Sequence, residues 1–491
     1  MGYALIIFAT VIAVASTHYV YRAWSLERVQ REQGCRPAVR FWSKDPFFGF
    51  DFQMAIHLNI PSLFQYHKKL GKTFYVSPFN NISTICTIAV DNIQAVNSGK
   101  EWGIQPLRLP GMEDFCGRGF LTTDGDIWHH SRKILKPSFS KHNILDTSVL
   151  SAEVEKLFLD VPEGGQTVDL QPYFHNMFLR TLLSFLLGVH PSEEHDGAPY
   201  PSETFIEAFH TAEFRTMFRI ALGRFWALAP QSKYIESCEV VHKYLDHYVE
   251  HALEKGSGLP AMDNKKVPTK QSLINDLAAQ TDDRESIRSQ ILQAMLASLE
   301  TTPALLGNTI FLLSRHPQYW RQMREEVLQA GCPLGYESLL NFKLLQNILS
   351  ETLRLYPIFP LLARVALTDT TLPVGGGFDQ RDHVYVPKGS HVVMSYFALH
   401  RDSSVFGDDV EEFRPDRWET IRPEQWQFMA FGGGNRACLG QSKALFEAAY
   451  VLARISAVFG KLESRDSAPW KGDLKLSCKS ANGCKVALYK E

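Results

Sequence analysis

The stretch from Phe431 to Gly440, Phe-Gly-Gly-Gly-Asn-Arg-Ala-Cys-Leu-Gly, constrains the fold of this chain more than any other. Its glycines allow a tight, bulged backbone to pass close to a flat ligand, where larger side chains would collide. Apolar residues follow at helical spacing, so Cys438 is expected just before or at the N-terminus of a helix. Free N–H groups and the helix dipole favour a thiolate there, the form of cysteine that binds metals. The alternative is a buried structural cysteine beside a Gly-rich turn.

The spacing F-x-x-G-x-R-x-C-x-G resembles the haem-binding signature of the cytochrome P-450 family. The resemblance implies a mainly α fold with a small β-rich region, and haem b as the cofactor. It also implies that Cys438 is the ligand of the haem iron. Phe431 and Gly440 would belong to the cofactor-binding loop, and Arg436 would face a haem propionate.

Two further segments carry residues that the resemblance places at the haem propionates. Trp128 and Arg132 lie four residues apart, on one face of an expected helix. The family uses a W-x-x-x-R helix in this way, although a half-buried Trp over an Arg stem is the ordinary structural alternative. Pro360–Arg364 resembles the strand over the haem edge, which makes Arg364 a second propionate partner.

A second arginine motif implies a buried charged triad. Residues 344–356 are expected to form a helix with Glu351 and Arg354 on one face. Phe413–Trp418 matches the family's second Arg motif, so Arg417 would join them. Two guanidiniums can satisfy one carboxylate without water, so we expect this triad to lock the cysteine loop in place. Its role is structural rather than catalytic.

A long helix is expected from Glu285 to about Arg315, begun by a capping box of Asp282 and Glu285. Inside it, the segment Ala-Ser-Leu-Glu-Thr-Thr-Pro resembles the family's A/G-G-x-D/E-T sequence. The resemblance implies that Glu300 and Thr301 supply protons for oxygen activation. Such protons must come from positioned groups, because the pocket is dry and apolar.

Three positions depart from the family pattern. Ser298 stands where the family usually has Gly, and Pro303 follows the Thr pair and lacks a helical N–H. The hypothesis is that Pro303 opens the groove that the Gly usually permits. The alternative is that Thr301 bonds back to its own helix. Leu362 replaces an Asn that is frequent in the fungal alkane and fatty-acid hydroxylase branch.

Resemblance to that fungal branch rests on four further segments: Gly34–Pro37, Lys44–Gly49, Asp124–Trp128 and Asp369–Gly377. Six aromatic residues between 200 and 228 are expected either in the core or as the roof of an apolar cavity. They are Phe205, Phe209, Phe214, Phe218, Phe225 and Trp226.

The N-terminus predicts a membrane anchor. Residues 2–21 contain no Asp, Glu, Lys or Arg, and about 20 residues is the length of a membrane span. Arginines dominate the charges that follow and hold that side in the cytosol. We expect an anchor at 1–22, a hinge at 23–45 and a haem domain at 46–491, with the chain single-pass in the endoplasmic reticulum membrane. Alternatives are a cleaved signal peptide and an interfacial anchor. The sequon at Asn81 would face the cytosol, unused.

Composition narrows the function classes. The net charge of -2, without a long basic run, gives no reason to expect nucleic acid. Eight cysteines are scattered singly, which suits a reducing compartment rather than a disulfide scaffold. No G-x-G-x-x-G fingerprint for a flavin or dinucleotide is present, so electrons must come from another protein.

These features together predict a haem-thiolate monooxygenase. It would hydroxylate a lipophilic substrate with O2 and with electrons from NADPH, delivered by a separate membrane-bound NADPH-cytochrome reductase. Lys133 and Lys443 are candidate docking residues for that reductase. The substrate is a long-chain fatty acid or alkane, or a fungal secondary metabolite such as a polyketide or terpenoid. A haem-thiolate peroxygenase or isomerase, and a non-enzymatic haem-binding sensor, are the alternative functions.

Overall fold

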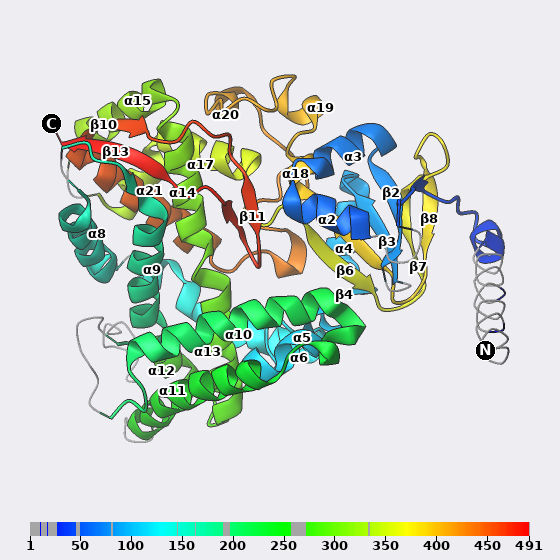
Figure 1. Cartoon of the computed structure of the whole chain (residues 1–491), viewed down its shortest axis with the longest axis horizontal. Helices are drawn as coiled ribbons and strands as arrows, with labels where there is room; N and C mark the ends of the chain where they lie inside the picture. Colours follow the sequence, from blue (N-terminus) through cyan, green and yellow to red (C-terminus); the bar gives the residue numbers. More distant parts are fainter. Residues whose placement is uncertain are drawn as a thin grey trace, which may run out of the picture.

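A computed structural model describes residues 10, 17, 27–45, 50–79, 82–144, 146–162, 164–189, 197–256, 272–331 and 334–490. The structure is mostly helical with small sheets, as predicted (Figure 1). The predicted anchor falls almost wholly outside the described residues, and so does the Asn81 sequon.

The elements run in the following order. The first helices are α2 (Phe50–Leu58), α3 (Ser62–Leu70), α4 (Val90–Ser98), α5 (Gln105–Cys116), α6 (Gly125–Leu135), η1 (Lys136–Phe139), α7 (Lys141–Ile144), α8 (Ser148–Asp160), α9 (Leu170–Leu187), α10 (Ser202–Leu222), η2 (Gly223–Leu228), α11 (Ser232–Gly256) and α12 (Leu273–Ala278). The later helices are α13 (Arg284–Ser298), α14 (Thr301–Leu313), α15 (Pro317–Ala330), α16 (Tyr336–Asn341), α17 (Lys343–Leu355), α18 (Tyr396–Leu399), α19 (Ser403–Phe406), α20 (Arg417–Thr420), η3 (Gly434–Arg436) and α21 (Gln441–Val458). The strands are β1 (Val39–Phe41), β2 (Thr73–Phe79), β3 (Ile82–Thr87), β4 (Trp102–Gly103), β5 (Val168–Asp169), β6 (Leu362–Ala366), β7 (Thr370–Gly376), β8 (Asp382–Val386), β9 (His391–Met394), β10 (Phe459–Ser464), β11 (Gly472–Leu474), β12 (Cys478–Ser480) and β13 (Lys485–Lys490).

A six-stranded mixed sheet forms most of the β-rich region, on the right in Figure 1. Its strand order is β1-β2-β3-β9-β6-β4, and β9 pairs parallel with β3 and antiparallel with β6. Burial alternates along β9, where Val392 and Met394 are fully buried, because one face of the sheet packs on a core. β1 lies inside the segment assigned to a hinge and pairs with β2, so the folded body begins before residue 46.

The helical region is built around α14, which is buried on all sides from Thr302 to Leu313. It contacts α9, α17 and α21, and Figure 1 shows it in the middle of the helical part. A helix that is apolar all round must be covered by others. One helical stretch of the described chain, Arg284–Leu313, is long and apolar enough to cross a membrane, but 78% of its most apolar window is buried inside the protein.

The predicted long helix is divided into α13 and α14. Residues 299 and 300 form a turn between them, at the point where Pro303 has no N–H to donate to the carbonyl of Leu299. The start of α13 also differs from the prediction. Asp283 rather than Asp282 is the N-cap, and its carboxylate accepts the N–H of Ser286 at 3.1 Å. The sequence offered two adjacent aspartates, and the backbone geometry decides between them.

The aromatic residues of α10 and η2 divide between core and surface. Phe205 and Phe209 are fully buried, and Phe205 stacks on Tyr244 with ring centroids 4.2 Å apart. Phe214 and Phe218, one helical turn apart, are 66% and 49% exposed. Phe205 and Phe209 are therefore core residues, which is one of the two predicted alternatives, whereas Phe214 and Phe218 are exposed on the surface.

Candidate functional site

The loop that begins at Phe431 places Cys438 at the start of α21, as predicted. Gly432 and Gly434 have φ angles of 70° and 65°, which glycine adopts without strain. The N–H of Cys438 donates to the carbonyl of Phe431 at 2.9 Å and closes the loop. A methyl group at Gly434 would lie 2.6 Å from a backbone oxygen of α4, so glycine is required for this close approach.

The other two loop residues predicted to bind the cofactor have different surroundings. Phe431 is half-buried and packs against the main hydrophobic cluster. Gly440 is the N-cap of α21 with φ -87°, and a side chain there would make ordinary contacts, 3.9 Å from the sulfur of Cys438. The protein's own atoms therefore do not require glycine at position 440, and the expected close approach of this backbone to a flat ligand stays a prediction.

Cys438 is the exposed cysteine among those that the structure describes, and the other six are buried. It lines an open cavity of about 490 Å³. The other lining residues are Lys133, Lys136, Pro137, Phe139, Ser140 and Leu439. Lys133 is thus on the cysteine side, as predicted for docking. Lys443 instead forms an ion pair with Glu447 and lies 4.9 Å from the ring centroid of Phe185.

Opposing effects act on the pKa of the Cys438 thiol. Burial raises its pKa, although the N–H groups of Gly440 and Gln441 and the charge of Arg132 act in the opposite direction. The N–H groups at the helix start thus act in the predicted direction, and the ionisation of the sulfur in the loaded protein stays a prediction. A bound metal ion deprotonates such a thiol outright.

Trp128, Arg132 and Arg436 come together beside the cysteine loop. Trp128 is buried, and the guanidinium carbons of Arg436 and Arg132 lie 4.4 and 5.8 Å from its ring centroid. Arg132 Nη2 donates to the carbonyl of Ala437 at 2.7 Å, next to the cysteine. The structure thus brings the helix pair and the loop arginine into one site.

Arg364 and Arg108 complete a cluster of guanidiniums with the two loop-side arginines. Burial, together with the charges of Arg364, Arg108 and Arg132, lowers the pKa of Arg436 to about 10. Arg108 shows the same lowering of its pKa to about 10, caused first by burial and then by Arg364. Within the described chain, Asp124 is the carboxylate that pairs with Arg436, at 2.6 Å.

Sequence reasoning missed Arg108. Its signal was an arginine in the first half of α5, a helix whose later residues are largely buried and apolar. Asp124 lies in a segment that resembles the fungal branch, but the resemblance implies no role for it. Neither residue has a spacing rule that ties it to the cysteine, since the fold brings three separate parts of the chain together.

The guanidinium cluster, defined as Arg108, Arg132, Arg364 and Arg436, fits an anionic cofactor. One carboxylate does not balance four partly or fully buried guanidiniums, and uncompensated buried charge is costly. Haem offers two propionates to such a cluster, and an accessible cysteine sulfur to ligate its iron lies alongside. The residues present therefore fit the cofactor that the resemblance implies.

Glu300 and Thr301 lie at the turn between α13 and α14. Thr301 Oγ1 donates to the carbonyl of Ala297 at 3.2 Å, which is the back-bonding alternative. Both oxygens of Glu300 are engaged: Oε1 lies 3.1 Å from His175 Nδ1, and Oε2 accepts from Lys479 Nζ at 2.7 Å. Burial alone would raise the pKa of Glu300, but these two partners lower it to about 2. Sequence reasoning missed both partners.

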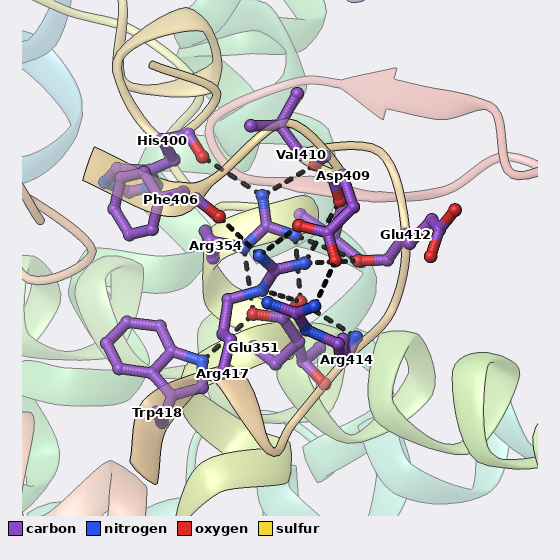
Figure 2. Close-up of polar contacts among 12 residues, drawn as sticks. Glu351, Arg354, His400, Phe406, Asp409, Val410, Glu412, Arg414, Arg417 and Trp418 are labelled. Carbon is purple, nitrogen blue, oxygen red and sulfur yellow. Dashed lines mark hydrogen bonds and ion pairs between the residues drawn. The ribbon is translucent and has the colours of Figure 1, made fainter. Parts of the chain in front are cut away.

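Figure 2 shows Glu351 held by the two arginines of the predicted triad. Arg354 donates through Nε and Nη2 to the two carboxylate oxygens, both at 2.9 Å, and Arg417 Nε donates to Oε1 at 2.8 Å. Trp418 Nε1 and the backbone N–H of Arg414 complete the shell, at 2.9 and 3.0 Å. All three triad side chains are fully buried. The indole of Trp418 is the partner that the sequence did not reveal.

Comparison with known proteins gives one consistent family. A family model described as Cytochrome P450 matches residues 40–475. The chain is 35% identical to the cytochrome P450 monooxygenase himC of Aspergillus japonicus, over 98% of this chain and 88% of that protein. It is 34% identical to the monooxygenase fsdH of Fusarium heterosporum, over 99% and 89%. It is 32% identical to apdE of Emericella nidulans, over 100% and 96%.

Proposed function

This chain belongs to the cytochrome P450 monooxygenases, and on that premise we propose that it binds haem b through Cys438 and hydroxylates a lipophilic substrate with O2. The observation that carries the proposal is the accessible sulfur of Cys438, at the start of α21 and beside the guanidinium cluster. Haem supplies the oxygen chemistry when bound, and the electron-donating thiolate favours O–O cleavage.

The chain's own residues then bind and orient the cofactor. Arg132, Arg364 and Arg436 hold the propionates together with Trp128, and we add Arg108 to this set. Arginine suits carboxylates because its planar fork donates two parallel hydrogen bonds. The triad of Glu351, Arg354 and Arg417 keeps the surrounding backbone in one geometry and takes no part in the reaction.

Proton supply is proposed for Glu300 and Thr301. In the described conformation the carboxylate is ion-paired and the hydroxyl bonds its own helix. Both groups must therefore exchange partners before a proton can pass. The turn at residues 299–300 favours that exchange, because the carbonyl of Leu299 has no donor from Pro303.

The substrate is proposed to be a long-chain fatty acid or alkane, or a fungal secondary metabolite. The named relatives are fungal monooxygenases, and Leu362 gives the start of β6 an apolar side chain. NADPH and a membrane-bound NADPH-cytochrome reductase are proposed as the electron source, with Lys133 in the docking surface.

A location at the endoplasmic reticulum membrane, through a span within residues 1–22, is also proposed. Besides the apolar N-terminal sequence, one surface of the folded part supports it. Phe214, Phe218, Phe225 and Leu228 of α10 and η2 are between 38% and 78% exposed. Exposed large apolar side chains in one stretch of chain suit contact with lipid.

Two measurements test the proposed function. The purified chain, reduced and treated with carbon monoxide, should give the absorption band of a thiolate-ligated haem. With a reductase, the chain should then consume NADPH when supplied with fatty acids, alkanes or terpenoids. Turnover with peroxide alone would favour a peroxygenase. Haem binding without turnover of either kind would favour a sensor, and absence of bound haem would contradict the proposal.

A further inference from the structure

His400 is a fully buried histidine that lies outside the guanidinium cluster and the proposed proton supply. It follows α18 as its C-cap. Its ring lies among aromatic side chains, with centroids 4.9 Å from Phe428 and 6.3 Å from both Phe406 and Tyr396. A buried imidazole in such a place is costly unless its nitrogens bond to something.

The imidazole bonds toward the cysteine loop. His400 Nε2 accepts the backbone N–H of Met429 at 2.9 Å, and both groups are buried. The carbonyl of Met429 accepts the N–H of Gly432 at 3.0 Å. The carbonyl of Phe431 accepts the N–H of Cys438 at 2.9 Å. Three hydrogen bonds and two short pieces of backbone thus lead from the ring to the sulfur ligand.

The backbone of His400 bonds in the other direction, to the triad. Its carbonyl accepts from Arg354 Nη1 at 3.1 Å, as Figure 2 shows. The same guanidinium donates twice to Glu351 and also to the carbonyls of Val410 and Glu412. His400 is therefore a residue whose main chain is held by the triad and whose side chain holds the cysteine loop.

We propose that His400 is a positioning residue for the cysteine ligand, and that it transmits the rigid geometry of the buried triad to the loop carrying Cys438. This inference rests on the proposed haem-thiolate function. When the imidazole is removed, the N–H of Met429 loses this acceptor. The start of the cysteine loop is then free to shift relative to the helices around it. The sulfur then takes more than one position relative to the iron.

The charges around the ring keep it in the form that this role needs. Burial, then Arg354 and Arg401, lower the pKa of His400 to about 3. The ring is therefore neutral at physiological pH, with a lone pair on Nε2 and the proton on Nδ1. That proton faces the backbone of Leu353 and Arg354 but has no partner of normal hydrogen-bond geometry among the described residues.

The test compares two replacements of His400 in the full-length holoprotein. His400→Leu removes the acceptor, whereas His400→Gln keeps an amide oxygen that can accept from Met429. The measurement is the rate at which the carbon monoxide complex of the reduced protein changes from the thiolate-type to the thiol-type absorption band. Haem content and the circular dichroism of the helices are followed in the same samples.

The Leu variant should convert about tenfold faster than wild type, which corresponds to about 1.4 kcal/mol, while haem content and helical signal stay constant. The Gln variant should stay within about twofold of wild type. Phe406→Leu is the matched control, because it also loosens the packing around the ring but leaves Nε2 in place. If His400→Leu does not fold, His400→Asn takes its place, since its shorter amide does not reach Met429.

Three outcomes would overturn the inference. One is conversion of the Leu variant at the wild-type rate. Another is loss of the thiolate band only in step with haem or helical signal, which is a general loss of stability. The last is a Gln variant as fast as the Leu variant. Failure of the proposed function looks different, because wild type itself would then show no thiolate-type band.

Discussion

At the scale of single residues, the cysteine loop shows how much of a site depends on the ligand. The helix N-terminus and Arg132 lower the pKa of the Cys438 thiol, yet burial raises it more. The spacing of the motif predicted where the sulfur lies, because glycines and a helix start are local features. It did not predict the balance of effects on the pKa of the sulfur, which depends on the groups that other segments place around it.

Replacing the sulfur tests its assignment directly. Cys438→Ser should abolish the thiolate-type band of the carbon monoxide complex and reduce monooxygenase turnover by at least about a hundredfold, because an alcohol does not donate electron density to the iron as a thiolate does. Cys35→Ala, a buried cysteine before the region matched by the family model, is the control and should retain the band. Full activity of the serine variant would contradict the assignment of the ligand.

Glu300 gives a prediction on pH. Its pKa in the folded chain is about 2, below the value of about 4.3 for a free glutamate, so ionisation favours the folded state. The contribution is complete above about pH 5 and is lost as the pH falls toward 2. We expect Glu300→Gln to lower the free energy of unfolding by on the order of 2 kcal/mol at neutral pH, with the difference from wild type shrinking below pH 4.

Urea unfolding of the two proteins between pH 3 and pH 7 measures this difference. Lys479→Met should reproduce most of the loss, because it removes the donor at 2.7 Å. A difference that stays constant over the whole pH range would show that the carboxylate is not ion-paired in solution.

At the scale of elements, the turn between α13 and α14 illustrates where local rules compete. Helical spacing predicted one continuous helix. The apolar stretch does continue from α13 into α14, although the helix itself is interrupted between them. Pro303 removes a helical hydrogen bond, and this backbone property can be read from the sequence. The ion pairs of Glu300 with α9 and β12 could not be read, since they depend on which elements the fold places around the turn.

Pro303→Ala tests whether this proline opens the helix. The new N–H can donate to the carbonyl of Leu299 and join α13 to α14. We expect stability to rise by on the order of 1 kcal/mol, while the fraction of NADPH electrons that reach product falls. Thermal unfolding and the ratio of product to NADPH consumed measure the two effects.

Ser298→Gly is the companion variant at the same turn. It restores the residue type usual in the family, so the ratio of product to NADPH should stay the same or improve. A collapse of that ratio would mean that Ser298, rather than Pro303, keeps the site competent.

The triad links α17 to the segment from Phe406 to Trp418, and its prediction needed both motifs together. We expect Arg354→Lys to leave the purified protein with little or no haem. One ammonium cannot replace the five hydrogen bonds that Arg354 donates, two to the buried carboxylate of Glu351 and three to backbone carbonyls. The ratio of haem to protein is the measurement. Arg414→Lys, a half-exposed neighbour that pairs with Asp409, should retain haem. Normal haem content in the Arg354→Lys variant would contradict a structural role for the triad.

At the scale of the whole molecule, the sequence predicted the class of fold and the main site but not the way distant segments meet. The cysteine loop, Trp128 and Arg364 carry family patterns, whereas Arg108, Lys479 and His175 carry none. Their roles follow from the arrangement of α5, β12 and α9 around α13 and α14, which no local periodicity encodes. The hinge prediction failed in part for the same reason, since β1 is a strand only because β2 lies beside it.

The exposed apolar side chains of α10 and η2 are the remaining feature that belongs to the whole molecule. If the chain rests on a membrane, Phe214 and Phe218 enter the lipid interface together, because they share one helix face. Transfer of each side chain out of water is worth about 1.5–3 kcal/mol, so replacing both with Ser should weaken binding of a chain lacking residues 1–22 to phospholipid vesicles by about a hundredfold or more. Cosedimentation with the vesicles measures the affinity.

Leu159→Ser provides the matched control, because this leucine is 85% exposed but lies on α8, a different helix from those that carry the aromatic face. It should leave vesicle binding unchanged. Equal loss of binding in both variants would mean that general hydrophobicity, and not one face of the molecule, drives the contact. Unchanged binding of the Phe214→Ser, Phe218→Ser double variant would show that this aromatic face contributes nothing measurable to the contact with lipid.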